Sequence, residues 1–210
     1  MGKSPLGAFG ATNGKTGNLV TYILRGQIVT RTIGKTKKKQ SISQIATTQR
    51  LTTVNEFLKT IKGLINLGFK FEAEGSTSNP YNVATSYNVK NAIKGQYPNF
   101  KIDYSQVMIS VGNLKPVVNL SVSKNSQCLT VSWAYDSKAD FCVRNDRAMI
   151  LFVFDDSEEP IYFLSGSLRS EGNQIIDFGS KSLDGSCHVY VSFLAEDRES
   201  VSDSEYLYLS

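Results

Sequence analysis

The chain has 210 residues, of which 40% are hydrophobic and 20% are charged. Both fractions are close to those of ordinary globular proteins, so the composition excludes a chain that is disordered as a whole. The length is enough for one large domain or two small ones. No stretch approaches the roughly 20 apolar residues that a membrane-spanning helix needs, so we expect no membrane span.

Charge is distributed unevenly along the chain, although the net charge is only +4. Residues 1–70 contain many Lys and Arg residues but a single acidic residue, Glu56, whereas the C-terminal third carries most of the Asp and Glu. A polyanionic partner, attraction between the two ends of identical molecules, and an ordinary solvated surface all remain open explanations. The isoelectric point of about 8.9 fits each of them.

The chain starts with a glycine-rich segment, residues 1–17, which contains the stretch "GAFGATNGKTGNLV". Its many glycines leave Leu6 and Phe9 as the only sizeable apolar side chains, so it buries little surface by itself. We interpret it as an arm that pairs through its main chain with a partner or with the chain's own sheet. Residues 18–33 then predict two strands joined by a turn at Arg25 and Gly26, followed by the basic loop "GKTKKKQ".

The next segment changes to helical spacing. Apolar residues recur every three or four positions between residues 43 and 68, which predicts an amphipathic helix that ends at Gly68. A second, shorter helix is predicted over residues 79–93 because Asn79 is a good N-cap and Pro80 suits the first helical position.

From Phe100 onward the hydrophobic period changes to two, which predicts seven or so short strands, the first of them over residues 101–112. The fold class is therefore α+β and mostly β. It comprises an N-terminal arm and β-hairpin, one or two helices, and a C-terminal sandwich of immunoglobulin or fibronectin-III type. The predicted domains are residues 1–99 and residues 100–210. We expect Trp133 in the core of the sandwich, packed against Val131, Ile150, Phe152 and Val191.

Several stretches resemble a known family. These are the start "MGK", the segment "GKTGNLV", the helix end "GLINLGF" and the C-terminal "VYVSFLAEDRESVSDSEYL". Together they resemble a set of short Bacteroidota proteins of unknown function that share an MGK…G…GKxGxxV leader. The resemblance implies a shared architecture and no catalytic residues, because the family carries no assigned reaction. Members often have a Pro soon after the second Arg, whereas this chain reads "RTIGKTKKK", which leaves the path after Arg31 open.

A phosphate-binding loop is the first chemical reading to test. The stretch Gly14-Lys15-Thr16 resembles the end of a Walker loop, but the first glycine of that motif falls on Phe9. The segment also precedes strand-forming residues, whereas a phosphate loop opens a helix. The sequence therefore argues against nucleotide binding.

Other reactive groups are sparse. His188 is the only histidine, and its neighbour Cys187 points to the opposite face of a strand, which makes a poor Cys–His pair. Cys128, Cys142 and Cys187 have no close pair, so they predict neither a disulfide framework nor a CxxC metal site, although one bridge stays open. The acidic runs at residues 155–159 and 196–205 match no calcium loop. We therefore predict no catalytic, cofactor-binding or metal-binding residue, and a protein that is not an enzyme.

The leading functional prediction is a structural, self-assembling or interaction protein, with a phage-like particle or a filament as its setting. The arm would dock on a neighbour's exposed sheet edge, and its glycines and aromatic residue are the predicted contact set: Gly7, Phe9, Gly10, Gly14 and Gly17. The partner is another copy of the chain or another protein of an assembly. Because no classical signal peptide is visible, we expect a cytoplasmic or particle-associated protein.

Two alternatives use other residues. A nucleic-acid-binding module would use the basic residues of the hairpin and loop, namely Arg25, Arg31, Lys35, Lys37, Lys38 and Lys39. A glycan-binding sandwich would use loop aromatics such as Tyr81, Tyr87 and Tyr97. We rank both below assembly, because the lysines are not interleaved with aromatic residues and no nucleic-acid fold signature is visible.

Overall fold

The computed structural model describes residues 2–3, 12–24, 26–35, 38–125, 128–136, 141–155, 157, 159–179 and 185–210, without the side chains of residues 141 and 142. Contacts divide the chain into two compact units, residues 1–41 and residues 42–210. Each unit is described by itself. Five residues of the predicted sites lie outside the described part: Gly7, Phe9, Gly10, Arg25 and Lys37.

The N-terminal unit is a three-stranded antiparallel sheet made of β1 (Gly14–Thr16), β2 (Leu19–Leu24) and β3 (Gln27–Thr32), in that order. Gly26 has a φ of 79°, a conformation that glycine adopts readily, and it starts the return strand of the predicted hairpin. The predicted strand pair is confirmed. The end of the predicted arm is β1, and Lys3 also exchanges backbone hydrogen bonds with Asn13. This part of the arm therefore pairs with the chain's own sheet.

The second unit opens with helices α1 (Ile42–Thr60), α2 (Lys62–Gly68), α3 (Lys70–Ala73) and α4 (Pro80–Asn91). The single helix predicted over residues 43–68 is two helices, because Ile61 leaves helical geometry at φ −113° and ψ 25°. The start of α4 confirms the prediction, since the side chain of Asn79 accepts a hydrogen bond from the backbone N–H of Asn82 at 2.7 Å.

Two antiparallel sheets, of four and three strands, follow the helices in this unit. The larger has the order β12-β11-β8-β9 and the smaller the order β10-β7-β6. Their strands are β6 (Ser121–Lys124), β7 (Cys128–Ser132), β8 (Arg147–Phe154), β9 (Ile161–Phe163), β10 (Asn173–Asp177), β11 (Cys187–Leu194) and β12 (Glu205–Leu209). The short helix α5 (Phe141–Arg144) precedes β8, and the 3-10 turn η2 (Arg169–Glu171) precedes β10.

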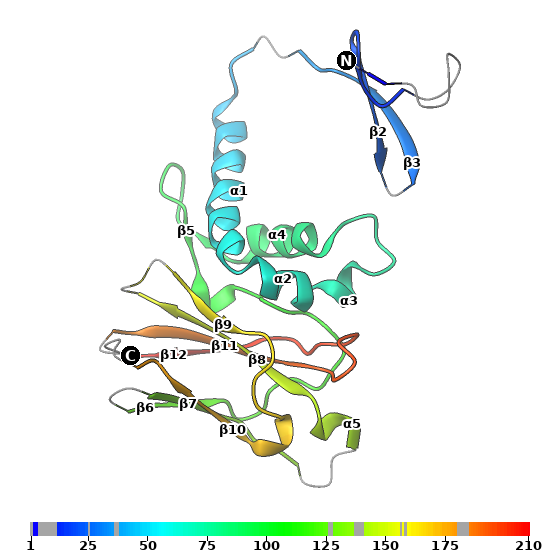
Figure 1. Ribbon diagram of the computed structural model, residues 1–210. Helices are drawn as coiled ribbons and strands as arrows, with labels where there is room; N and C mark the ends of the chain where they lie inside the picture. The colour runs from blue at the N-terminus through cyan, green and yellow to red at the C-terminus, as the bar shows by residue number, and fades with distance from the viewer. Residues whose placement is uncertain are drawn as a thin grey trace. The chain divides into compact units, whose positions relative to one another are not determined.

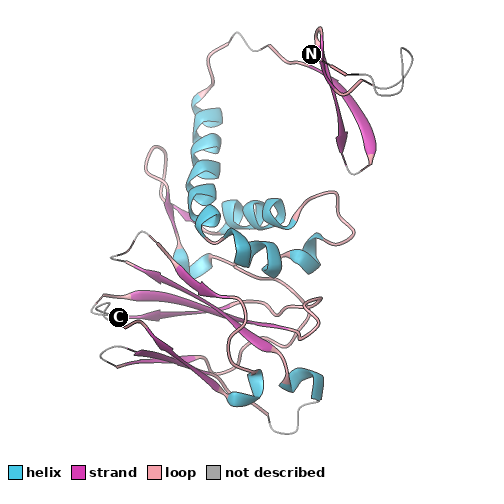
Figure 2. Ribbon diagram, viewed as in Figure 1, coloured by secondary structure: helices cyan, strands magenta, loops and turns pink. Residues whose placement is uncertain are grey.

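The larger sheet is covered on both faces (Figure 1). Leu151, Val153 and Tyr190 belong to one core with the helices, whereas Ile150 and Phe152 belong to a second core with β7 and β10. Successive side chains of a strand point to opposite faces, so β8 and β11 contribute to both cores. The unit is therefore built in three layers, helices, larger sheet and smaller sheet, which Figure 2 shows by secondary structure.

The strand predicted over residues 101–112 is mostly wrong. Strand β5 (Lys101–Ile102) pairs with β4 (Ile93–Lys94), the 3-10 turn η1 (Tyr104–Gln106) follows, and the chain then runs on without a strand. The side chain of Asn88 takes the place of a neighbouring strand, because it accepts from the N–H of Met108 at 3.0 Å and donates to its carbonyl at 3.1 Å. Val107 and Ile109 are two residues apart, as in a strand, but here they fill the core beneath the helices.

The chain is thus mixed α/β, with more strand than helix. Ala84 and Ala92 of the helical segment share a core with Val107 and Leu151. Contacts divide the chain between residues 41 and 42, and the domains at residues 1–99 and 100–210 stay a prediction. In the described part of the chain, no helix is both long and apolar enough to cross a membrane.

We predict that Trp133→Ala lowers the free energy of unfolding by about 3–5 kcal/mol, the usual cost of truncating a core aromatic residue. Trp133 is only 5% exposed, and its ring packs edge-on against Phe193 with centroids 5.5 Å apart. Its indole N–H donates to the carbonyl of Arg169 at 2.9 Å. Urea denaturation measures the loss. Val118→Ala, at a site 53% exposed, is the control that should change little.

We also predict that Gly68→Ala destabilises the protein by about 1–3 kcal/mol, as overpacking does. A Cβ at position 68 would overlap the carbonyl oxygen of Ile109 and lie 2.9 Å from the Cβ of Ser110. The matched control is Gly63→Ala in the same helix, where the new methyl group meets only the movable hydroxyl end of Tyr162 at 3.0 Å. Thermal melting of both variants tests the difference, and equal melting temperatures would contradict the close approach at Gly68.

Candidate functional site

The candidate site lies on the helix-facing side of the larger sheet, where the cover of helices ends. His188 and Tyr190 are two residues apart in β11, so they share this face. The register places Tyr208 of β12 opposite His188 and Tyr206 opposite Tyr190. Tyr190 is fully buried, but Tyr208 is 49% exposed. The same face therefore passes from a closed core to an open groove.

A chain of hydrogen bonds fixes the histidine ring. The Nε2 atom of His188 lies 3.2 Å from Oδ1 of Asp155, and its Nδ1 atom lies 2.8 Å from the hydroxyl of Tyr206. A carboxylate only accepts, so Nε2 carries the proton and donates to Asp155. In the neutral ring, Nδ1 then accepts from the Tyr206 hydroxyl. Ser186 donates through its hydroxyl to the second oxygen of Asp155, so the carboxylate is held from two sides.

Aromatic rings enclose the same histidine. The ring of Tyr104 stacks on His188 with a centroid distance of 4.4 Å and an interplanar angle of 28°. The ring of Tyr208 lies 5.0 Å away. The hydroxyl of Tyr190 donates to the backbone carbonyl of Tyr104 at 2.6 Å, which fastens that turn to the sheet. The fold itself therefore holds the ring of Tyr104 against His188.

The protonation states follow from burial. Burial lowers the pKa of His188, and the nearby Asp155 opposes this only in part, so the imidazole is neutral at pH 7. Burial also raises the pKa of Tyr104 and of Tyr206, so both phenols keep their protons. The cluster consequently orients rings and hydrogen-bond groups but provides no phenolate nucleophile. Burial raises the pKa of Cys187 to about 12, so that thiol is unreactive as well.

The groove beside the cluster has a volume of about 880 Å³. One wall is the uncovered end of the sheet with Asp155, His188, Tyr206 and Tyr208. The other wall is formed by α1, the β4–β5 hairpin and η1, through the residues Thr53, Lys94, Phe100, Lys101, Ile102, Asp103, Tyr104 and Ser105. The ammonium of Lys94 lies 4.0 Å from a carboxylate oxygen of Asp103. The groove thus combines aromatic rings with two acidic side chains, Asp103 and Asp155, and two basic side chains, Lys94 and Lys101.

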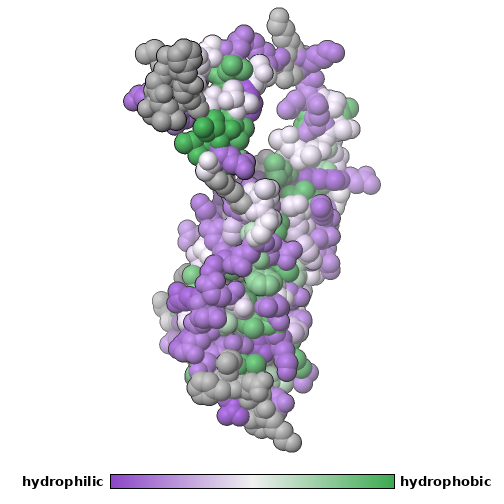
Figure 3. All heavy atoms as spheres, turned by 90° about the vertical axis from the view of Figure 1, so that its right-hand side faces the viewer, coloured by the Kyte–Doolittle hydropathy of each residue, from purple (hydrophilic) through white to green (hydrophobic). Residues whose placement is uncertain are grey.

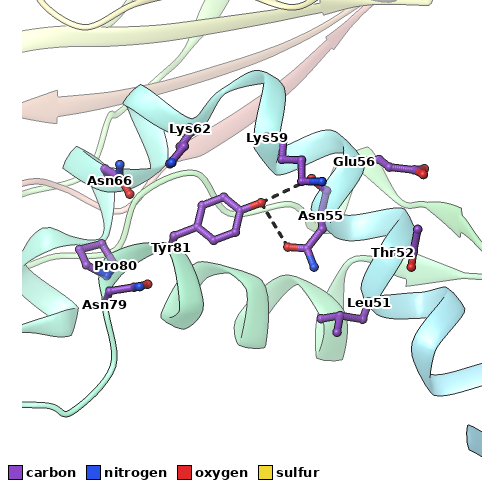
Figure 4. Close-up of a pocket in the computed structure, with 10 residues that line it drawn as sticks. All are labelled: Leu51, Thr52, Asn55, Glu56, Lys59, Lys62, Asn66, Asn79, Pro80 and Tyr81. Carbon is purple, nitrogen blue, oxygen red and sulfur yellow. Dashed lines mark hydrogen bonds between the residues drawn. The ribbon is translucent and has the colours of Figure 1, made fainter. Parts of the chain in front are cut away.

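A second pocket, of about 780 Å³, lies among the helices (Figure 4). It is lined by Leu51, Thr52, Asn55, Glu56, Lys59, Lys62, Asn66, Asn79, Pro80 and Tyr81. The hydroxyl of Tyr81 points to Asn55 and donates to its side-chain oxygen at 3.1 Å. Tyr81 and Asn55 therefore bind each other across the helices, and this contact supports the helical layer.

Of the described residues that the sequence predicted as sites, only Tyr81 is among the lining residues of these two pockets. Gly14 is in β1 and Gly17 is in the following turn, with φ values of 104° and 58°. The described basic residues are all exposed: Arg31, Lys35, Lys38 and Lys39. Tyr87 and Tyr97 are 37% and 44% exposed and line neither pocket. Among the described residues, no group of three or more His, Cys, Asp or Glu side chains is arranged to hold a metal ion.

Sequence reasoning missed the cluster because it treated His188 as an isolated residue. The separation of Cys187 and His188 onto opposite faces is confirmed, since Cys187 lies in the core beneath the smaller sheet. A usable signal was present in "CHVY" and "YLY", where His and Tyr recur with the period of a strand. Their pairing depends on strand register, which the sequence does not state.

The chain belongs to a family of unknown function, DUF6266, whose profile matches residues 11–208. The match covers both compact units and all of the candidate site. No curated protein matches the chain. Family membership therefore agrees with the resemblance seen in the sequence and assigns no activity to the groove.

We predict that acid lowers the free energy of unfolding through His188. Its pKa is lower in the folded protein than the ordinary 6.5, so below that pH the unfolded chain binds the proton more readily. The stabilising contribution is complete above pH 6.5 and is lost as the pH falls through the folded pKa. His188→Gln keeps one donor and one acceptor without titrating, so the variant should lose less stability than the wild type between about pH 7.5 and about pH 5.5. Urea denaturation at each pH measures the free energy of unfolding of both proteins. Equal losses of stability in the wild type and the variant over this pH range would contradict the prediction.

Proposed function

We propose that the protein is an interaction protein that associates with further copies of itself through the N-terminal unit. The observation that supports this proposal is that no apolar side chain is buried among the described residues of this unit. Among its described residues, the only buried side chain is that of Thr21, which is 5% exposed and pairs with the hydroxyl of Thr30 at 3.0 Å. A sheet this small is marginal in water without a packed apolar face.

Several large apolar side chains among the described residues of this unit are exposed. Five of them are between 36% and 64% exposed, namely Leu19, Tyr22, Ile23, Leu24 and Ile28. Figure 3 shows hydrophobic surface on this part of the chain. Covering one such side chain fully stabilises a complex by about 1.5–3 kcal/mol. Alternation along the strands places Leu19, Ile23 and Ile28 on one face of the sheet and Tyr22 and Leu24 on the other, so both faces offer apolar surface to a partner.

Charge favours a second copy as the partner. Residues 1–41 contain eight Lys and Arg and no acidic residue, so the remaining 15 basic and all 19 acidic residues lie in residues 42–210. The N-terminal unit of one copy is therefore attracted to the larger unit of another. Strand β3 is an edge strand and adds unpaired backbone groups to the contact. Contacts between unlike surfaces of identical chains build rings or filaments.

The type of β-sandwich and the setting of the protein are also matters of proposal. We propose an immunoglobulin or fibronectin-III-like relationship for the two facing sheets, supported by their antiparallel strands and by the shared core around Trp133. Association with a phage-like particle, an origin in Bacteroidota and the role of the leader motif stay predictions.

The double variant Ile23→Ser/Ile28→Ser tests the association. These two residues are direct partners in the β2–β3 register, so the change removes apolar surface from one place. Sedimentation velocity over a range of concentrations should show assembly of the wild type and a monomer for the variant. The control is Ile175→Ser, because Ile175 is 67% exposed on a strand of the larger unit. It should assemble like the wild type.

A wild-type protein that stays monomeric at every concentration would overturn the proposal. The nucleic-acid alternative is examined with the same samples and a short DNA duplex. A monomer that binds DNA with a steep dependence on salt would favour the alternative, because phosphate contacts release counterions. Changing the exposed Lys35, Lys38 and Lys39 to Ala should then reduce that dependence on salt.

A further inference from the structure

The groove beside His188 presents an exposed aromatic ring that the fold holds in place. Tyr208 is 49% exposed, yet its strand is paired with β11 over five residues. Its ring rests on His188, which is itself held by Asp155 and by Tyr206. A ligand that stacks on this ring therefore meets a surface that needs little further ordering, which reduces the entropic cost of binding.

The polar side chains around the ring are of both signs. Asp103 and Asp155 are balanced by Lys94 and Lys101, so the lining has no net charge. A phosphorylated ligand would face two carboxylates, and a cationic ligand would face two ammonium groups. A neutral ligand with many hydroxyls suits this mixture, because each hydroxyl both donates to a carboxylate and accepts from an ammonium group.

We propose that this groove binds a neutral oligosaccharide. The apolar C–H face of a pyranose ring would stack on Tyr208, and hydroxyls at the rim of the sugar would bond to Asp103, Asp155 and Lys94. The volume of about 880 Å³ is in the range of small-molecule sites. The proposal stands independently of self-association, because the groove lies wholly within residues 42–210.

The pocket of Figure 4 is a weaker candidate for the same ligand. Its one aromatic residue, Tyr81, is only partly exposed and uses its hydroxyl to hold Asn55. The exposed Tyr87 of α4 lines neither pocket, although it was one of the aromatics expected to bind glycans. Tyr87 therefore serves as a matched control for Tyr208, since both are exposed tyrosines of the same unit.

Isothermal titration calorimetry of the full chain tests the proposal with four probes, cellohexaose, mannohexaose, maltohexaose and chitohexaose. At least one should bind, and Tyr208→Ala should weaken that binding about tenfold or more. Tyr208→Phe keeps the ring and should retain most of the affinity. Tyr87→Ala should bind like the wild type. Thermal melting of each variant confirms that the fold is intact.

Three results would overturn the proposal. They are the absence of binding to all four probes, unchanged binding by Tyr208→Ala, and binding that is lost at about 0.5 M NaCl, where contacts between charges are screened. The Ile23→Ser/Ile28→Ser variant keeps the groove intact and should bind the sugar even though it does not assemble. Failure of the sugar site and failure of self-association are thus separate outcomes.

Discussion

The structure of the larger unit depends on the need to cover both faces of the two central strands. Strands β8 and β11 are apolar along almost their whole length, and most of their side chains are fully buried. A sheet whose central strands are apolar on both sides is stable only between two other layers. The helices supply one layer and the smaller sheet supplies the other. This constraint explains why the helical segment and the C-terminal strands form one unit.

A polar side chain lies at each end of the buried strand β8, and each forms a contact with a residue of another segment. Asp146 precedes the strand and forms a buried ion pair with Arg169, with Oδ2 and Nε 3.3 Å apart. The guanidinium carbon of Arg169 lies 3.8 Å over the ring of Phe193. Burial raises the pKa of Asp146 and lowers that of Arg169, because desolvation disfavours the charged form of each. Removing one partner would destabilise the fold, because the other charge would be left buried without compensation. Asp155 follows the strand at its other end and holds His188. The Asp146–Arg169 pair lies beside the core between the two sheets, whereas the Asp155–His188 pair lies beside the groove.

Local features of the fold were predictable from the sequence, whereas features that depend on distant partners were not. The hairpin, the Asn79 cap, the strand pair around Lys124 and the burial of Trp133 follow from spacing and from local chemistry. The stretch of residues 101–112 alternates like a strand, but the backbone of Met108 at its centre bonds to the side chain of the distant residue Asn88. The helix break at Ile61 allows α1 and α2 to pack on different parts of the core. The candidate site was invisible for the same reason, since Asp155, His188 and Tyr206 meet only through the pairing of three strands.

The two units of the chain differ in how much each can stabilise itself. The larger unit has two hydrophobic cores of its own, and the polar groove lies on the surface of this fold. The N-terminal unit has a complete hydrogen-bonded hairpin, yet in its described residues no apolar side chain is buried. The family profile spans residues 11–208, so the hairpin is part of what defines the family and is not an addition to this chain. The exposed apolar side chains of the described hairpin are available to another surface, as the proposed self-association requires. In that proposal, the eight positive charges of residues 1–41 would favour an acidic surface as the partner. The proposed self-association and the proposed sugar binding use separate parts of the chain, so we expect a substitution in one part to leave the other function unchanged.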